Sequence, residues 1–325
     1  MISIVMAAYN ASEYIALAIE SILNQTFSEF ELIVIDDGST DNTVKIVEHY
    51  IELDQRVRLI QNNHTGVCHA RNTGIQSSKY SWIAIMDADD ISLPQRLEKQ
   101  INAAKANPEV VAWGTYVQHM SSTGDILSLQ KQGPISQEEY HSLMNDGEIP
   151  FIIHPTTMMK KDVFLKVGAY DSQFPLAQDL ELMSRMAHQG IIIAIPEPLV
   201  WYRVHSQSAS MQKFFSQQFF TRWIIARHQA RLAGTGLPEL NQFIAEEKKQ
   251  SILLRLAQQI GIVGRFNYRM AGLLLANKQY LQGGFYLCMA IVFHPSYSLP
   301  RLWKQRFSQE ARRYLQQSQN PGEIR

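Results

Sequence analysis

Three acidic residues, Asp87, Asp89 and Asp90, stand within four positions of the segment WIAIMDADDIS. Carboxylates this close repel one another, and a divalent cation relieves the repulsion. Mg²⁺ and Mn²⁺ prefer hard oxygen ligands and often combine one or two carboxylates with substrate phosphates. The Asp-x-Asp (DXD) pattern is common by chance, but here it follows an apolar run and precedes Pro94. The segment therefore indicates a divalent cation site at the end of a buried strand.

A second acidic pair, Asp36 and Asp37, follows the apolar run ELIVI. A carboxylate there can accept hydrogen bonds from a nucleobase or from ribose hydroxyls. A turn or helix cap is the alternative, and it suits Asp36 well.

Between the two acidic segments lies GVCHARNTG, in which glycines allow close backbone approach and Arg71 offers fixed donors to a phosphate. An ordinary surface arginine is the alternative for Arg71.

Two further positions could take part in chemistry. Asp179, preceded by Gln178, opens a segment with helical spacing. It is either a helix cap or a general base that removes a proton from an acceptor hydroxyl. His205 follows the segment WYRV and is either structural, a ligand that completes the coordination of a cation, or a partner of a pyrophosphate oxygen. Together these residues suggest a nucleotide diphosphate held through a metal ion, but they do not name the reaction.

Strand and helix signals alternate over the first 115 residues. Apolar runs predict strands at residues 2–8, 31–35, 57–60, 82–86 and 110–113, and helical spacing predicts helices over residues 13–23, 41–53 and 94–106. Asn10 is the expected cap of the first helix. Such alternation predicts an α/β fold with a mostly parallel sheet and helices on both faces. Ligands bind such sheets at the carboxyl ends of the strands, so we expect Tyr9, Asp37 and Asp87 to meet at one edge.

The rest of the chain changes character twice. Residues 120–150 are polar and predict an insertion with one helix over residues 137–144, whereas residues 150–203 return to an α/β pattern. From residue 211 the pattern is helical throughout, so we place a domain boundary near residue 210. Residues 211–325 contain 16 Lys and Arg against 5 Asp and Glu, while residues 1–210 contain 14 against 25. The basic region suits an anionic partner such as lipid headgroups or phosphates, or it is a solvated helical surface.

Composition narrows the class of protein. A chain with 46% hydrophobic and 18% charged residues is an ordinary globular protein. The two cysteines, Cys68 and Cys288, supply neither a disulfide framework nor a metal-ligand pattern, which favours a reducing, cytoplasmic compartment. Neither a secretory signal nor a membrane-spanning helix is expected. The apolar run at residues 284–293 is too short to span a bilayer and suits a buried helix or one at a membrane surface.

Motifs in a fixed order resemble the inverting family-2 glycosyltransferases with a GT-A fold, of the bacterial cell-surface polysaccharide type. The matching segments are VMAAYN, SILNQTFSEFELIVIDDGSTDNT, GVCHARNTGI, WIAIMDADDISLPQRLEKQ, HPTTMMKKDVFLKVGAYDSQF with the following Gln-Asp, and PLVWYRVHSQSAS. The resemblance covers residues 1–210 as a GT-A domain with a Rossmann-like, mostly parallel sheet. It leaves residues 211–325 as a basic, mainly helical C-terminal region.

The resemblance implies a substrate class and a cofactor. It implies transfer of a hexosyl or N-acetylhexosaminyl group from a nucleotide-diphosphate donor, with a UDP-sugar favoured, to a glycan or a lipid-linked acceptor. Mn²⁺ or Mg²⁺ is the implied cofactor, and no nucleic-acid partner is implied. The basic C-terminal region then suggests peripheral attachment to the inner face of the cell membrane.

The resemblance also implies a role for each matching residue. Donor binding falls to Ala7, Tyr9, Asp37, Arg71 and Asp87, with Asp37 reading the base. Metal binding falls to Asp89 and His205, catalysis as a base to Asp179, and the acceptor side to Gln178 and His154. Gln178 departs from the pattern, because the family commonly has Glu at that position, and this leaves the positioning of the acceptor open.

Two other functions stay open. One is a catalytically silent member that binds a nucleotide-sugar, which Gln178 favours. The other is a sugar nucleotidyltransferase, which would want a Gly-rich loop with Arg and Lys directly after the first strand. The chain has AAYNASEY at that place, which argues against the nucleotidyltransferase.

Overall fold

We describe the protein from a computed structural model, which describes residues 1–205 and 209–303. The chain forms two compact units. The first contains Met1–His119, Leu129–Arg203 and Phe220–Leu237, and the second contains Met120–Ser128, Val204–Phe219 and the chain from Pro238 onward. The chain crosses into the second unit at residue 204 and returns to the first at residue 220, so this division does not test the domain boundary near residue 210, which stays a prediction.

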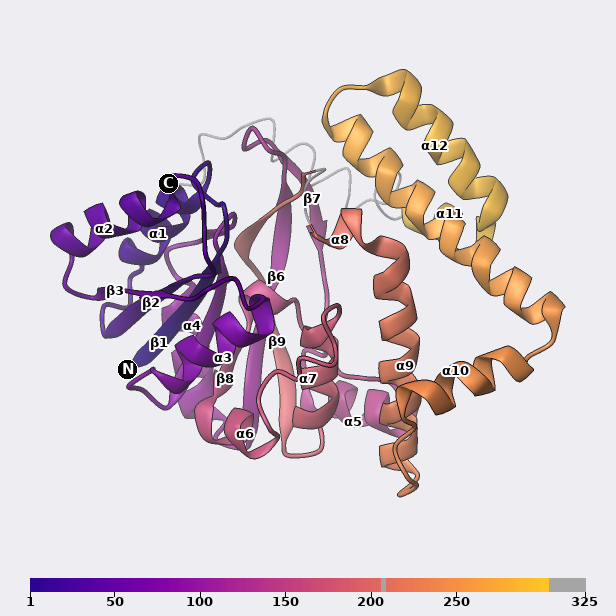
Figure 1. The fold of residues 1–325 in the computed structure, drawn as a ribbon, viewed down its shortest axis with the longest axis horizontal. Helices are drawn as coiled ribbons and strands as arrows, with labels where there is room; N and C mark the ends of the chain where they lie inside the picture. Colours follow the sequence, from indigo (N-terminus) through magenta and orange to yellow (C-terminus); the bar gives the residue numbers. More distant parts are fainter. Residues whose placement is uncertain (206–208, 304–325) are drawn as a thin grey trace. The chain divides into compact units, whose positions relative to one another are not determined.

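A mixed sheet forms the centre of the first unit (Figure 1). Within the described chain it has nine strands in the order β3-β2-β1-β4-β8-β6-β9-β5, with β7 paired to β6. The strands β3, β2, β1 and β4 are parallel, whereas β8 runs antiparallel to both β4 and β6. The strands are β1 (Ile2–Ala8), β2 (Phe30–Asp36), β3 (Val57–Gln61), β4 (Trp82–Asp87), β5 (Ile91–Ser92), β6 (Val110–Met120), β7 (Ile126–Gln130), β8 (Met158–Lys160) and β9 (Ile191–Arg203).

The central strands are apolar throughout because both of their faces are covered. Alternate residues of a strand point to opposite faces, so Ile4 and Met6 of β1 pack on one side and Val5 packs on the other. The helices α1 (Ile15–Leu23), α2 (Thr43–Leu53) and α4 (Arg96–Ala106) contribute buried side chains to the first side. The helices α3 (Val67–Gln76), α5 (Gln137–Asn145), α6 (Lys161–Lys166) and α7 (Gln178–Met186) contribute them to the second. The predicted α/β fold with a mostly parallel sheet is therefore confirmed.

One local prediction was wrong, and one strand was not predicted. Asn10 does not cap α1, because Tyr14 occupies the cap position and makes no side-chain cap bond. Asn10 instead adopts a left-handed backbone (φ 48°), and its Oδ1 accepts a hydrogen bond from the N–H of Thr40. The segment at residues 120–150 contains the predicted helix, α5, but also the strand β7.

In its described residues the second unit is mainly helical, and it also contains the turn between β6 and β7 with the adjoining strand ends. Its part of the chain includes α8 (Ala209–Gln212), α10 (Leu240–Lys249), α11 (Ile252–Ala276), α12 (Tyr280–Phe293) and α13 (Pro295–Leu302), while α9 (Phe214–Leu232) belongs to both units. The helices α11 and α12 lie side by side (Figure 1), and Gly283 of α12 faces Leu275 of α11. A Cβ at Gly283 would lie 2.7 Å from the Leu275 side chain, so glycine permits this close packing. Among the described helices, none is both long and apolar enough to cross a membrane.

Candidate active site

Three parallel strands end side by side and bring the predicted polar residues together. In the sheet register Ala7 of β1 pairs with Asp87 of β4, and Ala8 pairs with Asp36 of β2. Neighbouring strands lie about 4.8 Å apart, so these positions share one short edge. Arg71 reaches the same edge from α3, where its Nη2 donates to Asp87 Oδ1 at 2.7 Å. The edge is the one at which sheets of this kind bind ligands.

The loop beyond β2 is organised by Asp37, which is buried. Asp37 Oδ1 accepts from the N–H of Thr65 at 2.8 Å, and Oδ2 accepts from the N–H of Gly66 at 2.9 Å. The neighbouring His64 places its ring 4.2 Å from the ring of Tyr9, centroid to centroid. Asp37 thus holds the 64–66 loop beside Tyr9. Its carboxylate can still accept a further hydrogen bond from a ligand, because each oxygen has two lone pairs.

Asp36 stabilises a turn, which was the alternative to nucleoside binding for this residue. Its Oδ2 accepts from the N–H of Gly38 at 3.2 Å and from the N–H of Ser39 at 3.1 Å. Gly38 has φ +81°, and a Cβ there would lie 3.0 Å from the backbone nitrogen of His64. This turn therefore fixes where the chain leaves the sheet after Asp37.

The turn that carries the DXD acids is held by the last residue of β9. Asp90 Oδ1 accepts from the backbone N–H of Arg203 at 2.7 Å, and Arg203 Nε donates to the backbone oxygen of Asp89 at 2.7 Å. Burial raises the pKa of Asp87, although Arg71 opposes the shift. Burial and the charges of Asp89 and Asp87 raise the pKa of Asp90 well above its usual value. Asp90 is buried, and Asp87 and Asp89 are partly exposed beside it, so the three acids are crowded, an arrangement that a cation stabilises.

The donor set at this turn fits Mg²⁺ or Mn²⁺. Asp87 and Asp89 supply hard oxygen donors, and these ions usually take one or two carboxylates and complete their shell with phosphate and water. Within residues 1–205 and 209–303, no group of three or more His, Cys, Asp and Glu could hold a metal ion by itself. His205, the expected further ligand, belongs to the second compact unit.

Arg71 is a buried cation with unused donors. The residue is 6% exposed, and its charge is matched by Asp87. Its Nε and Nη1 are buried, and neither has a hydrogen-bond partner in the described part of the chain. An unmatched buried donor costs roughly 1–3 kcal/mol, and an anion with oxygen acceptors removes that cost. The geometry of Arg71 therefore suits a phosphate.

Asp179 lies at the start of α7 and interacts electrostatically with Arg71 and Asp87. Its Oδ1 accepts from the N–H of Leu180 at 2.9 Å. Burial raises the pKa of Asp179, and Arg71 opposes the shift. Ala177, the cap residue before α7, has a left-handed backbone (φ 57°), a conformation that costs a non-glycine residue about 1 kcal/mol. The structure thus gathers Asp179, Arg71 and Asp87 into one cluster.

Tyr170 also belongs to this cluster. It was not identified from the sequence, because nothing in the segment GAYD distinguishes this tyrosine from any other. Its ring centroid lies 5.9 Å from Arg71 Cζ, and its hydroxyl lies 2.8 Å from Nε2 of His154. Burial and the neighbouring charge of Arg71 hold the pKa of His154 well below its usual value, so this imidazole is neutral. His154, expected on the acceptor side, is buried behind Tyr170. Gln178 is partly exposed at the first position of α7.

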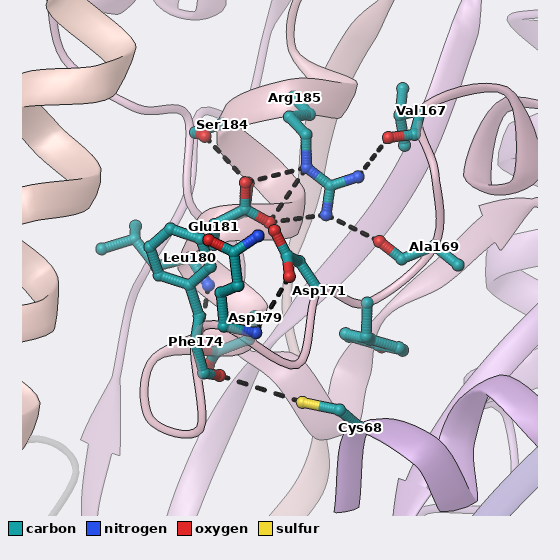
Figure 2. A network of polar contacts seen from close by, with 12 residues as sticks. Cys68, Val167, Ala169, Asp171, Phe174, Asp179, Leu180, Glu181, Ser184 and Arg185 are labelled. Carbon is teal, nitrogen blue, oxygen red and sulfur yellow. Dashed lines mark hydrogen bonds and ion pairs between the residues drawn. The ribbon is translucent and has the colours of Figure 1, made fainter. Parts of the chain in front are cut away.

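An arginine clamps the loop that leads into α7 (Figure 2). Arg185 Nε donates to both carboxylate oxygens of Glu181 at 2.9 Å, and Nη2 lies 2.5 Å from Oε2. The same guanidinium donates from Nη1 to the carbonyl of Val167 and from Nη2, at 2.6 Å, to the carbonyl of Ala169. Further along this loop the carbonyl of Phe174 faces Sγ of Cys68 at 3.8 Å. The clamp fixes the start of the segment that ends at Asp179.

Comparison with known proteins shows which family has this sheet and these strand-end acids. The family model described as Glycosyl transferase family 2 matches residues 3–168. This match covers more than half of the chain, so the protein belongs to glycosyltransferase family 2. The expected family and the expected GT-A fold are confirmed.

Particular relatives make the placement more concrete. The O-antigen biosynthesis glycosyltransferase WbnJ of Escherichia coli is 36% identical over 215 residues, which are 64% of this chain and 81% of WbnJ. The crystal structure of S. aureus TarS 1–349 in complex with UDP-GlcNAc has a TM-score of 0.55 at 16% identity, covering 94% of this chain and 93% of that one. The mannosyltransferase PcManGT from Pyrobaculum calidifontis, in complex with GDP-Man and Mn²⁺, has a TM-score of 0.53 at 16% identity, covering 98% and 84%. The two structures show a shared fold.

Proposed function

We propose that this glycosyltransferase moves a hexosyl or N-acetylhexosaminyl group from a nucleoside-diphosphate donor to a hydroxyl of a glycan or lipid-linked acceptor. We propose inversion at the anomeric carbon and a role in cell-surface polysaccharide biosynthesis. The observation that carries the proposal is the buried Arg71–Asp87 pair at the strand ends, with Asp179 in its electrostatic field. The name of WbnJ, an O-antigen enzyme, supports the polysaccharide assignment.

The nucleoside end of the donor is assigned to the β1 and β2 ends. Ala7 and Tyr9 line that edge, and the buried carboxylate of Asp37 accepts the N–H donors of a nucleobase. Tyr9 is 48% exposed, so its ring offers a stacking surface. A UDP-sugar is favoured, and the structural neighbour bound to UDP-GlcNAc supports this choice.

The pyrophosphate is assigned to Arg71 and the DXD turn. The unmatched Nε and Nη1 of Arg71 are donors for phosphate oxygens. Asp87 and Asp89 would hold Mn²⁺ or Mg²⁺, with His205 proposed as a further ligand. When bound, the ion would neutralise charge on the leaving nucleoside diphosphate. The neighbour that contains GDP-Man and Mn²⁺ supports this metal. Arg71 stabilises the same developing negative charge by hydrogen bonding.

Asp179 is proposed as the base that removes the proton from the attacking acceptor hydroxyl. Desolvation raises the pKa of its partly exposed carboxylate, which makes it a better proton acceptor than a fully solvated aspartate. Attack on the face opposite to the departing diphosphate then inverts the anomeric centre. Gln178 and His154 are placed on the acceptor side, where the amide of Gln178 can hydrogen-bond an acceptor sugar but cannot take a proton.

The decisive experiment measures release of nucleoside diphosphate from a panel of nucleotide-sugars, with Mn²⁺ supplied and then chelated. We expect release from one donor that stops with the chelator. Asp89→Asn should abolish metal-supported nucleotide binding, because a ligand charge is lost at constant size, whereas the exposed Asp146→Asn should bind as the wild type does. Unchanged metal-supported affinity in Asp89→Asn would contradict the assignment.

One rival keeps a specific observation in its favour. Gln178 in place of an acidic residue is compatible with a silent member that binds a nucleotide-sugar without turning it over. Tight nucleotide binding without turnover across donors and acceptors would support that rival and reject the proposed reaction.

A further inference from the structure

The helix α12 presents an apolar stripe to solvent. Leu281, Phe285, Cys288 and Val292 are all exposed, with Leu281 93% and Val292 71% exposed. They recur at i, i+4, i+7 and i+11, a spacing that places them along one face of a helix. The opposite face is buried: Ala290 is fully covered, and Gly283 packs on α11. The sequence of α12 contains no charged residue, so its outer face is arranged for an apolar partner.

The start of α11 adds a second exposed apolar face to the same unit. Its exposed large apolar side chains are Ile252, Leu253, Leu254, Leu256 and Ile260, of which Ile252 is 73% and Leu253 is 80% exposed. Four of them, at i, i+1, i+4 and i+8, lie within about a third of the helix circumference, and Leu254 lies outside that arc. A soluble surface helix normally carries polar residues on this face. For residues 284–293, the exposed Phe285, Cys288 and Val292 of α12 exclude the alternative of a fully buried helix.

The charge of this region selects the kind of partner. From residue 251 to residue 303 the sequence contains no Asp or Glu, and its five basic residues are Arg255, Arg265, Arg269, Lys278 and Arg301. Arg255 lies beside the exposed apolar residues of α11, and Lys278 lies two residues before α12 begins. A surface with exposed apolar and basic groups and no acids matches an anionic lipid surface, which offers acyl chains and phosphates.

We propose that the outer face of α12, with the start of α11, docks on an anionic lipid membrane and lies in the plane of its interface. The 14 residues of α12 extend about 21 Å, shorter than the roughly 30 Å hydrocarbon core, so the helix lies on the bilayer. A second copy of the chain would cover the apolar residues but would bring two acid-free basic surfaces together, which is electrostatically unfavourable. This inference goes beyond the proposed transfer reaction and does not depend on it.

Vesicle binding of the full chain tests the proposal. We expect sedimentation with vesicles of phosphatidylcholine mixed with phosphatidylglycerol, little binding to phosphatidylcholine alone, and weaker binding in high salt. The double variant Leu281→Glu with Phe285→Glu should lower the partition coefficient about a hundredfold, because two large apolar side chains no longer insert. Leu53→Glu, at an exposed leucine of α2 in the first unit, is the matched control and should change it little.

The charge contribution has its own pair of variants. Arg255→Gln should weaken binding to the anionic vesicles about fivefold, and the exposed Lys105→Gln of α4 should not. Nucleotide binding should be unchanged in every one of these variants, so failure here is distinguishable from failure of the proposed transfer reaction.

Four results would overturn the proposal. The first is equal binding to the two kinds of vesicle. The second is unaltered binding of the double variant. A dimer that the double variant dissociates would assign the face to a second copy of the chain. Vesicle binding that appears only after residues 304–325 are removed would assign the face to that segment instead.

Discussion

Replacing Arg185 by Met removes one cation that four acceptors share. Glu181 is 2% exposed and receives both its ion pair and its short hydrogen bonds from this guanidinium. Breaking one side of a buried ion pair costs about 3–5 kcal/mol, because the remaining charge stays buried. The carbonyls of Val167 and Ala169 lose a donor as well, at about 1 kcal/mol each. Since these costs overlap, we expect Arg185→Met to lower the free energy of unfolding by about 4 kcal/mol.

A double-mutant cycle in urea unfolding separates the two parts of this cost. Glu181→Met leaves Arg185 with its two carbonyl partners, and the double variant Glu181→Met with Arg185→Met removes both charges of the pair. We expect the double variant to lose only about 2 kcal/mol, less than Arg185→Met alone, which corresponds to a coupling of at least about 2 kcal/mol. Lys166→Met, a nearby exposed residue, is the matched control and should stay within about 0.5 kcal/mol of the wild type.

The same variant should also affect transfer, because the clamped loop ends at Asp179. Arg185→Met should therefore lower the transfer rate more than the nucleotide affinity. Additive costs in the cycle, or a loss below about 1 kcal/mol in Arg185→Met, would refute the view that the guanidinium compensates a buried carboxylate.

Three further outcomes are expected. Asp179→Asn should keep nucleotide affinity and lower the transfer rate about 10²–10⁴-fold, and a near-normal rate of nucleotide release would remove Asp179 as the base. Burial raises the pKa of Asp179, and the base acts only when ionised. The wild-type rate, measured against pH, should therefore be lost as pH falls through this raised pKa, and a rate that stays constant there would exclude Asp179 as the base. Gly74→Ala should destabilise the protein by about 1–3 kcal/mol, because its Cβ would lie 2.4 Å from Ile35 Cδ1. Gly272→Ala, a helical glycine with nothing within 4 Å, should instead stabilise it slightly, and equal signs in urea unfolding would contradict the packing argument.

The fold was largely predictable where apolar runs are long. The first strand was predicted with its observed bounds, Ile2–Ala8, and β2, β3 and β4 were each short by one or two residues at the ends. The strand β7, with five half-buried residues, and β8, with three residues, have no such signal. Because β8 lies between β4 and β6, the sequence could not reveal the antiparallel half of the sheet. Pairing across distant segments is invisible to local periodicity.

The site was predictable only where a residue sits next to its own strand. Asp37 and Asp87 could be placed at one edge from the order of strands and helices alone, whereas Arg71 stayed open between a phosphate contact and a surface arginine. The bond between Asp90 and Arg203 joins residues 113 positions apart, and no spacing rule indicates it. The i, i+4 spacing of Glu181 and Arg185 is compatible with an ion pair on a helix, but the sequence gives no indication that Arg185 also bonds the backbone of Val167 and Ala169.

The bond from Arg203 to the acid turn sets a limit on how this protein can be divided and recombined. The segment that matches the family model stops at residue 168, while the N–H that orients Asp90 comes from residue 203. A chimera that borrows only residues 3–168 would inherit the DXD acids without the strand that fixes their geometry, and without Asp179. A chimera that exchanges the donor site between relatives therefore has to take β9 from the same parent as the N-terminal half.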